Sequence, residues 1–274
     1  MPEPGWLHER SIAEATAREA GALLRGLHGR VREIHHKGTV DLVTEADRAS
    51  EALIAQRLAE AFPDDALLAE EGTGAGDRAA ERLWIVDPLD GTTNFAHGHP
   101  VFAVSIALVV EGQVCVGVVY DPLRDELFAA MRGAQPTLNN RPIRVSTTDT
   151  LLDALLATGF AYDPQERRVN IPFFQHFVDI AQAVRREGAA ALDLCYVACG
   201  RFDAYWERAV NPWDVAAAAL LLEQAGGQLS MYDGRPFDPF AREIVATNTR
   251  LHEDMLREIA AVVAKYGLPP PAAS

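Results

Sequence analysis

This 274-residue sequence has few cysteines, no long hydrophobic run and no secretory start. Its three cysteines, Cys115, Cys195 and Cys199, lie in apolar patterns, which excludes a disulfide framework and predicts buried, reduced thiols. The longest strongly apolar stretch, residues 101–110, is too short to span a bilayer. Residues 1–10 show no charged start leading into an apolar segment, so we expect a cytoplasmic location.

Positive charge is also scarce. Lysine and arginine total 25 against 39 aspartates and glutamates, a formal net charge of -14. A nucleic-acid backbone requires a basic surface, so general nucleic-acid binding is not expected. The chain is nonetheless 49% hydrophobic, which suffices for a large core in one unit or in two tightly joined halves.

Two carboxylates three residues apart follow an apolar run in the segment WIVDPLDGTTNF, residues 84–95. Residues 83–86 predict a short buried strand that Pro88 ends, and Gly91 permits a tight turn into a short helix. The free N–H groups of such a helix favour a phosphate, while Asp87, Asp90 and the Leu89 carbonyl offer oxygens suited to magnesium. A surface turn is the alternative, because Asp-Pro and Asp-Gly are common turn dipeptides.

The segment AEEG, residues 69–72, has the same layout of an apolar strand, paired carboxylates and a glycine. If the two strand ends face each other, Glu70 joins Asp87 and Asp90 and the set can supply two magnesium ions with shared ligands. A solvated loop is the alternative for a Glu-Glu pair in isolation.

Two further acids begin helical patterns. Asp47 follows Thr44 by three residues, which is the spacing of an N-terminal capping pair. The alternative is functional: Asp47 accepts a proton from the Thr92 hydroxyl, which then orients an attacking water. Asp214 starts a very apolar helix that Gly226 and Gly227 end. Its negative charge either interacts favourably with the helix dipole or, if Asp214 is buried with the helix, binds a second metal ion.

Taken together, these motifs resemble the inositol monophosphatase family of magnesium-dependent, lithium-sensitive sugar phosphatases, over about residues 7–266. The resemblance rests on several ordered motifs: Lys37 before DLVTEAD, the AEEG and WIVDPLDGTTNF segments, the GAAA segment at 188–191, the YWE segment at 205–207, and PWD with its closing glycines.

The resemblance implies a role for each matching position. Metal ligands are expected at Glu70, Asp87, the Leu89 carbonyl, Asp90 and Asp214, which together hold two or three Mg²⁺ ions. The catalytic set is Asp47, Thr92 and Glu70, with Asp47 and Thr92 activating water. Substrate contacts are expected at Asp90, Gly91, Thr92, Gly188, Ala189, Ala190, Glu207 and Asp214, of which Gly91 and Thr92 bind phosphate through their backbone amides.

The expected activity is therefore phosphomonoester hydrolysis of inositol monophosphate or a related polyol phosphate by metal-activated water. The sequence departs from the family pattern at Glu187 and Ala189, which weakens a claim of myo-inositol specificity. Histidinol phosphate, fructose 1,6-bisphosphate and a 3′-phosphonucleotide stay open as substrates. Glu207 suits polyols or an amine, whereas Arg185 and Arg186 can supply charge for a second phosphate.

The resemblance implies a homodimer and, as a different class of function, a regulatory partner of the transcription machinery. Its fold is an α+β layered αβαβα sandwich, with residues 1–145 as an N-terminal half carrying the metal ligands, 146–268 as a C-terminal half carrying specificity residues, and a disordered tail at 269–274. We expect helices at 7–30, 46–61 and 173–184 and from residues 188, 213 and 251. Strands are expected near residues 66, 83, 102, 113, 126, 155, 202, 228 and 244.

Overall fold

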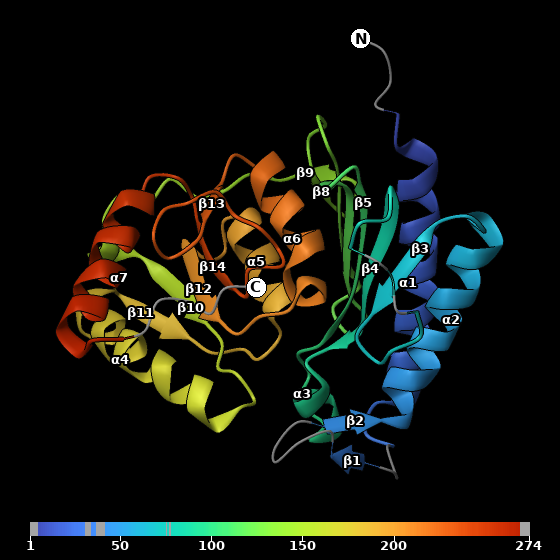
Figure 1. Ribbon diagram of the computed structural model, residues 1–274, viewed down its shortest axis with the longest axis horizontal. Helices are drawn as coiled ribbons and strands as arrows, with labels where there is room; N and C mark the ends of the chain where they lie inside the picture. The colour runs from blue at the N-terminus through green and yellow to red at the C-terminus, as the bar shows by residue number, and fades with distance from the viewer. Residues whose placement is uncertain (1–4, 31–33, 37–41, 75, 77, 269–274) are drawn as a thin grey trace.

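The computed structural model describes residues 5–30, 34–36, 42–74, 76 and 78–268. Figure 1 shows five layers of alternating helices and sheets, which confirms the predicted αβαβα sandwich. One outer layer contains α1 (Leu7–Leu27) and α2 (Glu45–Ala61), and the other contains α4 (Pro164–Ile180) and α7 (His252–Tyr266). Between the two sheets lie α5 (Ala190–Ala198) and α6 (Pro212–Gln224).

The first sheet has seven strands in the order β3-β4-β5-β6-β7-β8-β9. All neighbours are antiparallel except β3 and β4, which run parallel. The strands are β3 (Ala66–Ala69), β4 (Arg82–Asp90), β5 (Ala103–Val110), β6 (Gln113–Asp121), β7 (Glu126–Met131), β8 (Thr137–Leu138) and β9 (Arg141–Pro142). The short helix α3 (Thr92–Ala96) follows β4, and a separate pair contains β1 (Ile34–His36) and β2 (Leu42–Thr44).

Strand β4 continues past the point where we expected Pro88 to end it. Its pairing with β5 runs from Arg82 to Asp87 and resumes at Asp90, with three steps on β4 against two on β5. The proline lacks a backbone N–H, so the ladder is interrupted locally rather than ended, and the extra residue is absorbed as a bulge. A regular strand sends residues three apart to opposite faces, and the bulge removes this constraint from Asp87 and Asp90.

The second sheet has five strands in the order β11-β10-β12-β14-β13. They are β10 (Leu155–Thr158), β11 (Ala183–Arg185), β12 (Ala204–Arg208), β13 (Gln228–Ser230) and β14 (Glu243–Thr247). Strand β10 lies parallel to both β11 and β12, while β14 runs antiparallel to its neighbours. As a result, the carboxyl ends of β10 and β12 lie at the same edge of the sheet.

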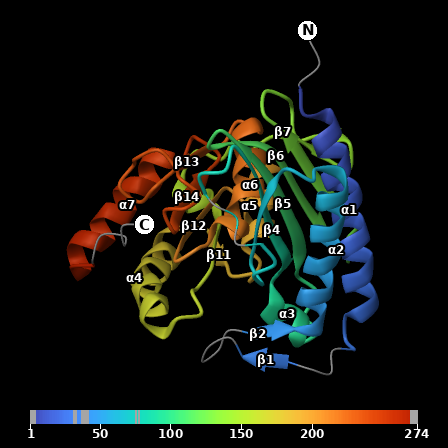
Figure 2. The same ribbon diagram turned by 45° about the vertical axis from the view of Figure 1, so that its right-hand side comes forward.

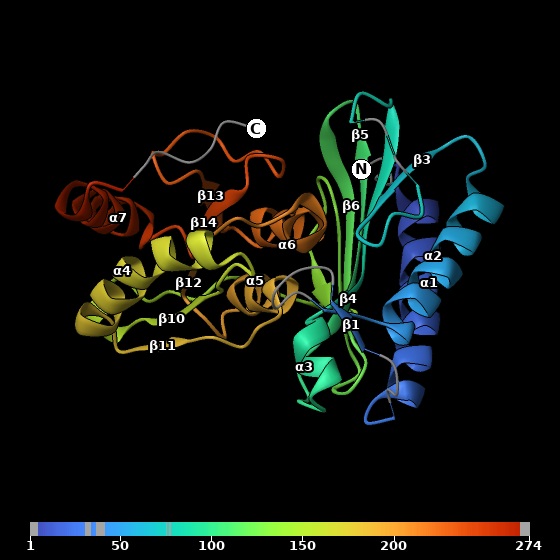
Figure 3. The ribbon, with the colours of Figure 1, turned by 60° about the horizontal axis from the view of Figure 1, so that its bottom comes forward.

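The middle helices are buried from both sides. Residues Val215 to Leu222 of α6 are all buried, since the helix packs on the first sheet and also on α5. Figure 3 shows both helices between the sheets. The largest hydrophobic core accordingly contains residues from both sheets. The division into halves at residue 145 stays a prediction.

One helix differs clearly from its expected bounds. Helix α4 begins at Pro164, nine residues before the expected start, because the Asp163 side chain accepts hydrogen bonds from the N–H groups of Gln165 and Glu166 and Pro164 occupies the first turn. It ends at Ile180, and β11 begins three residues later. Lys37 and the expected tail at 269–274 lie outside the described residues. None of the helices in the described ranges is long and apolar enough to cross a membrane.

Candidate active site

The ends of two parallel strands bring the first acids together. Ala69 at the end of β3 pairs with Val86 on β4, and the Glu70 N–H donates to the Val86 carbonyl at 3.2 Å. Glu70 therefore lies beside Asp87, as the repeated strand-acid-glycine pattern predicted. The Asp87 side chain is 2% exposed and accepts a hydrogen bond from the Leu89 N–H at 2.9 Å.

Asp90 links the two sheets. Its carboxylate accepts hydrogen bonds from the N–H groups of Ala190 at 3.2 Å and Ala191 at 2.8 Å, at the start of α5. Ala189, the N-cap residue of α5, provides no side-chain cap. A carboxylate from the first sheet thus caps a helix of the second half, and the negative charge also suits the positive end of the helix dipole.

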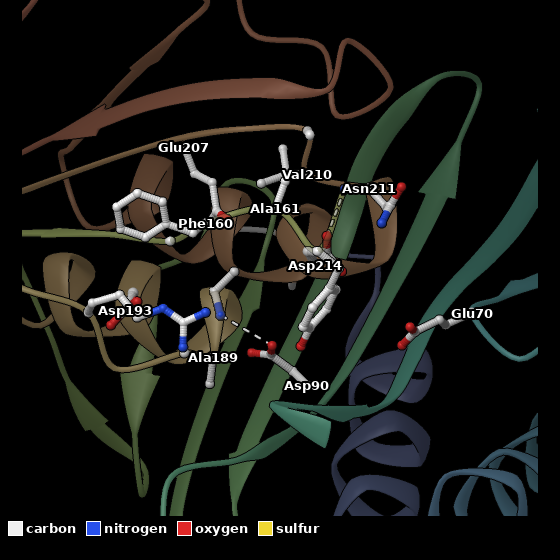
Figure 4. A pocket seen from close by; sticks show the side chains of 16 residues that line it. Glu70, Asp90, Phe160, Ala161, Ala189, Asp193, Glu207, Val210, Asn211 and Asp214 are labelled. Atoms are coloured by element: carbon white, nitrogen blue, oxygen red, sulfur yellow. Dashed lines mark hydrogen bonds between the residues drawn. The ribbon is translucent and has the colours of Figure 1, made fainter. Parts of the chain in front are cut away.

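Asp214 comes from the start of α6. It is the third residue of the helix, and its carboxylate accepts a hydrogen bond from the Asn211 N–H at 2.7 Å. Pro212 occupies the first turn, where a missing N–H costs nothing. Figure 4 shows Asp214 and Asp90 among the residues that line the pocket, with Glu70 on one flank.

Burial and mutual repulsion strongly raise the pKa values of these acids. Burial, followed by the charges of Glu70, Asp90 and Asp214, raises the pKa of Asp87 well above its usual value. Burial raises the pKa of Asp90 to about 7, against hydrogen bonds from α5 that lower it. Burial also raises the pKa of Asp214 to about 8. A site that holds three such carboxyls has a strong preference for cations.

The donors fit hard divalent cations. Carboxylates from Glu70, Asp87, Asp90 and Asp214 are hard oxygen ligands, and the Leu89 carbonyl lies on the same bulged segment. Across the described part of the chain, no three His, Cys, Asp or Glu side chains form a ready-made cage around one point. Magnesium does not need one, because it usually keeps several waters and takes one or two carboxylates together with substrate phosphate.

Asp47 has both of the roles that the sequence left as alternatives, the helix cap and the contact with Thr92. Its Oδ2 accepts hydrogen bonds from the Thr44 N–H at 2.8 Å and the Thr44 hydroxyl at 2.5 Å, which completes a capping box at the start of α2. Its Oδ1 accepts a hydrogen bond from the Thr92 hydroxyl at 2.8 Å. Burial raises the pKa of Asp47 against these three bonds. The cap and the contact with Thr92 therefore coexist on one carboxylate.

A cavity of about 120 Å³ lies beside the acids. Seven of the predicted site residues line it: Glu70, Asp90, Gly188, Ala189, Ala190, Glu207 and Asp214. Four others lie deeper, since Asp47, Asp87, Leu89 and Thr92 are buried and do not line the cavity. Gly91, the N-cap of α3 at a φ of 93°, also lies outside the lining. We call the part of the pocket that Glu70, Asp90 and Asp214 line, together with the buried Asp87, the metal end, because these four acids are the expected metal ligands.

Another part of the lining, which we call the distal end, contains Arg186, Asp193 and Glu207. Figure 4 shows Asp193 and Glu207 on the side of the pocket away from Glu70. Glu207 lies in β12 and accepts a short hydrogen bond from the Tyr205 hydroxyl. Burial raises the pKa of Glu207 to about 7, while Tyr205 and Arg186 lower it. Burial and then the charge of Glu207 raise the pKa of Asp193 well above its usual value.

Sequence reasoning missed Asp193. Its side chain is 1% exposed, and its Oδ1 has no hydrogen-bond partner within the described residues. Asp193 follows Ala189 and Ala190 by four and three residues, so it lies on the same face of α5. An acid within an apolar helix, one turn after a predicted substrate segment, was the signal that could have found it.

Asn94 was also missed as a connecting residue. Its side-chain amide donates to the carbonyls of Val101 at 2.8 Å and Glu187 at 2.9 Å. Asn94 follows the acids in WIVDPLDGTTNF, whereas Glu187 precedes the GAAA segment. The amide therefore fixes the segment before α5 against the first sheet, on the same side as the cap from Asp90.

Comparisons with known proteins identify the family of this chain. A model of the inositol monophosphatase family matches residues 7–264. An inositol-1-monophosphatase of Synechocystis sp. is 48% identical over 258 residues, which cover 93% of this chain and 89% of the relative. A protein of Pseudomonas aeruginosa named Nus factor SuhB is 44% identical over 259 residues, covering 91% of this chain and 94% of the relative.

A solved structure of an inositol monophosphatase from Anabaena (Nostoc) sp. PCC 7120 superposes with a TM-score of 0.84 at 44% identity. The match covers 96% of this chain and 97% of that one. With the buried acids, the pocket and these matches agreeing, the chain belongs to the inositol monophosphatase family, whose members are metal-dependent enzymes that hydrolyse phosphate monoesters.

Proposed function

We propose that this enzyme is a magnesium-dependent phosphatase of small polyol phosphates, with inositol monophosphate as the first candidate. The observation that carries the proposal is the convergence of four carboxyls, of which Glu70, Asp90 and Asp214 line one end of the pocket and Asp87 is buried beside them, next to the Asp47–Thr92 hydrogen bond. The name of the relative from Synechocystis supports the substrate class.

Glu70, Asp87 and the Leu89 carbonyl hold the first Mg²⁺ in this proposal, and Asp87, Asp90 and Asp214 hold the second. A third ion contacts Glu70. The bound ions polarise the attacking water and neutralise charge on the leaving oxygen. The backbone N–H groups of Gly91 and Thr92 bind the phosphate oxygens.

Thr92 and Asp47 position the attacking water. The Thr92 hydroxyl donates to Asp47 Oδ1, so its oxygen lone pairs are left to accept a hydrogen bond from the attacking water. Asp47 is held in turn by Thr44, and it lies beneath the site rather than in the pocket. In this arrangement water attacks phosphorus directly, its proton would pass through the Thr92 hydroxyl to Asp47, and no covalent phosphoenzyme forms.

The distal end selects the substrate. Glu207, the Asp90 and Asp214 carboxylates and the segment Gly188–Ala190 contact the substrate hydroxyls, and a small neutral Ala189 leaves room beside them. Two acids, Asp193 and Glu207, oppose one arginine, Arg186. This balance suits hydroxyl or ammonium donors better than a second phosphate. Inositol monophosphate and histidinol phosphate are therefore better candidate substrates than fructose 1,6-bisphosphate and 3′-phosphonucleotides.

A panel of these four substrates, measured with purified enzyme in magnesium and after chelation, tests the proposal. We expect phosphate release from inositol monophosphate that stops on chelation and returns with Mg²⁺. Hydrolysis that survives complete chelation would contradict the metal-dependent mechanism. A marked preference for fructose 1,6-bisphosphate would instead contradict the reading of the distal end.

A second function deserves a test because a relative that is 44% identical is named a Nus factor. In that case the protein also binds the transcription machinery. An Asp90→Asn variant used as bait should retain such a partner if binding is independent of catalysis. Homodimerisation, a cytoplasmic location and inhibition by lithium also stay predictions, and light scattering and a lithium titration address the first and the last.

A further inference from the structure

Glu51 is a buried carboxylate that the catalytic scheme does not use. It lies in α2, is 1% exposed, and accepts two backbone hydrogen bonds, from Glu71 N–H at 2.7 Å and Thr73 N–H at 2.8 Å. Burying a charged group is unfavourable unless hydrogen bonds compensate it, and here both bonds go to the loop that carries Glu70.

The two peptide groups that flank Glu70 are each fixed by one partner. The Glu70 N–H donates to the Val86 carbonyl on β4, and the Glu71 N–H donates to Glu51. Fixing the peptide planes on both sides of a residue fixes the direction of its Cα–Cβ bond. The Glu70 side chain accordingly extends into the pocket in Figure 4.

Neighbouring side chains of α2 contact the segment that carries Asp87 and Asp90. Asp47 accepts a hydrogen bond from Thr92, and the Ser50 hydroxyl donates to the Pro88 carbonyl at 2.8 Å. Asp47, Ser50 and Glu51 are spaced by three and four residues, so they share one face of the helix. Figure 2 shows α2 along the outer side of the first sheet, with its N-terminal end beside α3.

We infer that Glu51 is a positioning residue, which acts through the Glu70 loop to set the affinity of the enzyme for Mg²⁺. One face of α2 thereby aligns two separate segments, the loop that carries Glu70 and the continuous segment that contains Pro88 and Thr92. This inference rests on the proposed role of Glu70 as a metal ligand. Groups that orient a ligand commonly change metal affinity by about 10- to 100-fold when replaced.

The test compares Glu51→Gln with Asp121→Asn. Asp121 is a buried control: it is 0% exposed, its Oδ1 accepts two backbone hydrogen bonds, from Leu123 N–H at 2.9 Å and Arg124 N–H at 3.0 Å, and its Oδ2 pairs with the Arg124 guanidinium at 2.7 Å. It lies at the end of β6, outside the pocket lining. Glutamine presents an NH₂ group to one of the two donors, so it can keep only one bond.

Two measurements separate the effect of Glu51 on the Glu70 loop from its effect on Mg²⁺ affinity. Hydrogen exchange without metal should show faster exchange at the Glu71 and Thr73 amides in Glu51→Gln and unchanged exchange there in Asp121→Asn. Calorimetric titration with Mg²⁺ alone should give a dissociation constant raised by about tenfold or more in Glu51→Gln only. At saturating Mg²⁺, kcat should return toward the wild-type value.

Glu51→Asp provides a second variant if the glutamine does not fold. The shorter carboxylate should keep part of the contact and give an intermediate dissociation constant. Wild-type exchange and Mg²⁺ affinity in both folded Glu51 variants would overturn the inference, as would an equal loss of affinity in Asp121→Asn. If the wild-type protein binds no Mg²⁺, the proposed function fails instead, and the exchange rates still decide whether Glu51 holds the loop.

Discussion

The metal end and the distal end of the pocket both gather buried acids, but they balance the charge differently. At the metal end, the groups that raise the pKa of Asp87 most, after burial, are other carboxyls. At the distal end, the pKa of Glu207 is lowered by the Tyr205 hydroxyl and by Arg186, both from the chain itself. At the metal end the carboxyls repel one another, so a bound cation would relieve them, whereas at the distal end Arg186 offsets part of the charge. Burial still raises the pKa of Glu207 to about 7, and burial with the charge of Glu207 raises that of Asp193.

Asp90→Asn should have the largest effect, because Asp90 belongs to the metal end and also caps α5. Turnover should fall by about a thousandfold, since the variant loses a proposed metal ligand and, with it, transition-state stabilisation. Steady-state kinetics at saturating Mg²⁺ measure this fall in turnover. Asp203→Asn is the control: it is also 7% exposed and hydrogen-bonded, to Ser146 and Leu155, but lies outside the pocket lining. Near-wild-type activity of Asp90→Asn would break the distinction between the two ends.

Thr92→Ala should slow turnover by about a hundredfold, because the water loses the hydroxyl that orients it. Metal affinity should change little, since Thr92 is not among the proposed ligands. Turnover and a calorimetric Mg²⁺ titration are measured on the same sample. Thr247→Ala, another buried threonine whose hydroxyl bonds to His252, is the control. Lost Mg²⁺ affinity in Thr92→Ala would show that Thr92 belongs with the ligands.

Magnesium should stabilise the fold. Binding only to the native state adds about 2.7 kcal/mol to the free energy of unfolding at a hundredfold excess over the dissociation constant. For a chain of this size, the Tm should rise by roughly 5 to 10 °C. Thermal unfolding with and without Mg²⁺ measures this rise, and Asp90→Asn should reduce it. An unchanged Tm across the magnesium titration is incompatible with the converging carboxyls.

The metal-free protein should become less stable as pH rises. The pKa values of Asp90, about 7, and Asp214, about 8, lie above the value of about 3.9 expected in the unfolded chain. Between pH 4 and 8 the native state therefore binds more protons, so the free energy of unfolding falls as pH passes through 7 and 8. Thermal unfolding at several pH values should show this slope without Mg²⁺ and a smaller slope with it.

Glu207→Gln should have the smallest effect and is the sharpest test of the distal end. The preference among inositol phosphate, histidinol phosphate and sugar phosphates should change by about 1–3 kcal/mol in kcat/KM, while p-nitrophenyl phosphate is hydrolysed as before. Glu243→Gln replaces another buried acid in the same sheet, outside the pocket lining, and is the control. Equal slowing of every substrate by Glu207→Gln would place Glu207 with the catalytic groups or with the fold.

The sequence predicted the metal end better than the distal end for a physical reason. Asp87, Leu89 and Asp90 are adjacent in one segment, and Glu70 follows a strand that pairs with it, so local patterns indicate the grouping. The layered fold followed from the family motifs. Asp193 was missed because it contacts the pocket only after α5 packs against β12, and helical spacing alone does not separate it from a core position.

Pro88 illustrates the limit of local rules. A missing N–H correctly indicated a break in the ladder, but the flanking pairs from Arg82 to Asp87 and at Asp90 keep the strand in the sheet. Likewise, the capping box and the contact with Thr92 were weighed as alternatives for Asp47, whereas the two oxygens of one carboxylate serve both. Partners distant in sequence decided each case.

The bulge in β4 has a consequence for insertions and deletions. Deleting one residue between Asp87 and Asp90 would restore even spacing against β5 and remove an irregularity from the sheet. The same deletion would place the second acid two residues after the first, out of register with the α5 amides that it caps. If Asp87 and Asp90 hold the metal as proposed, we expect a more regular and better-paired strand to be inactive, so the length of the segment matters as much as its acids.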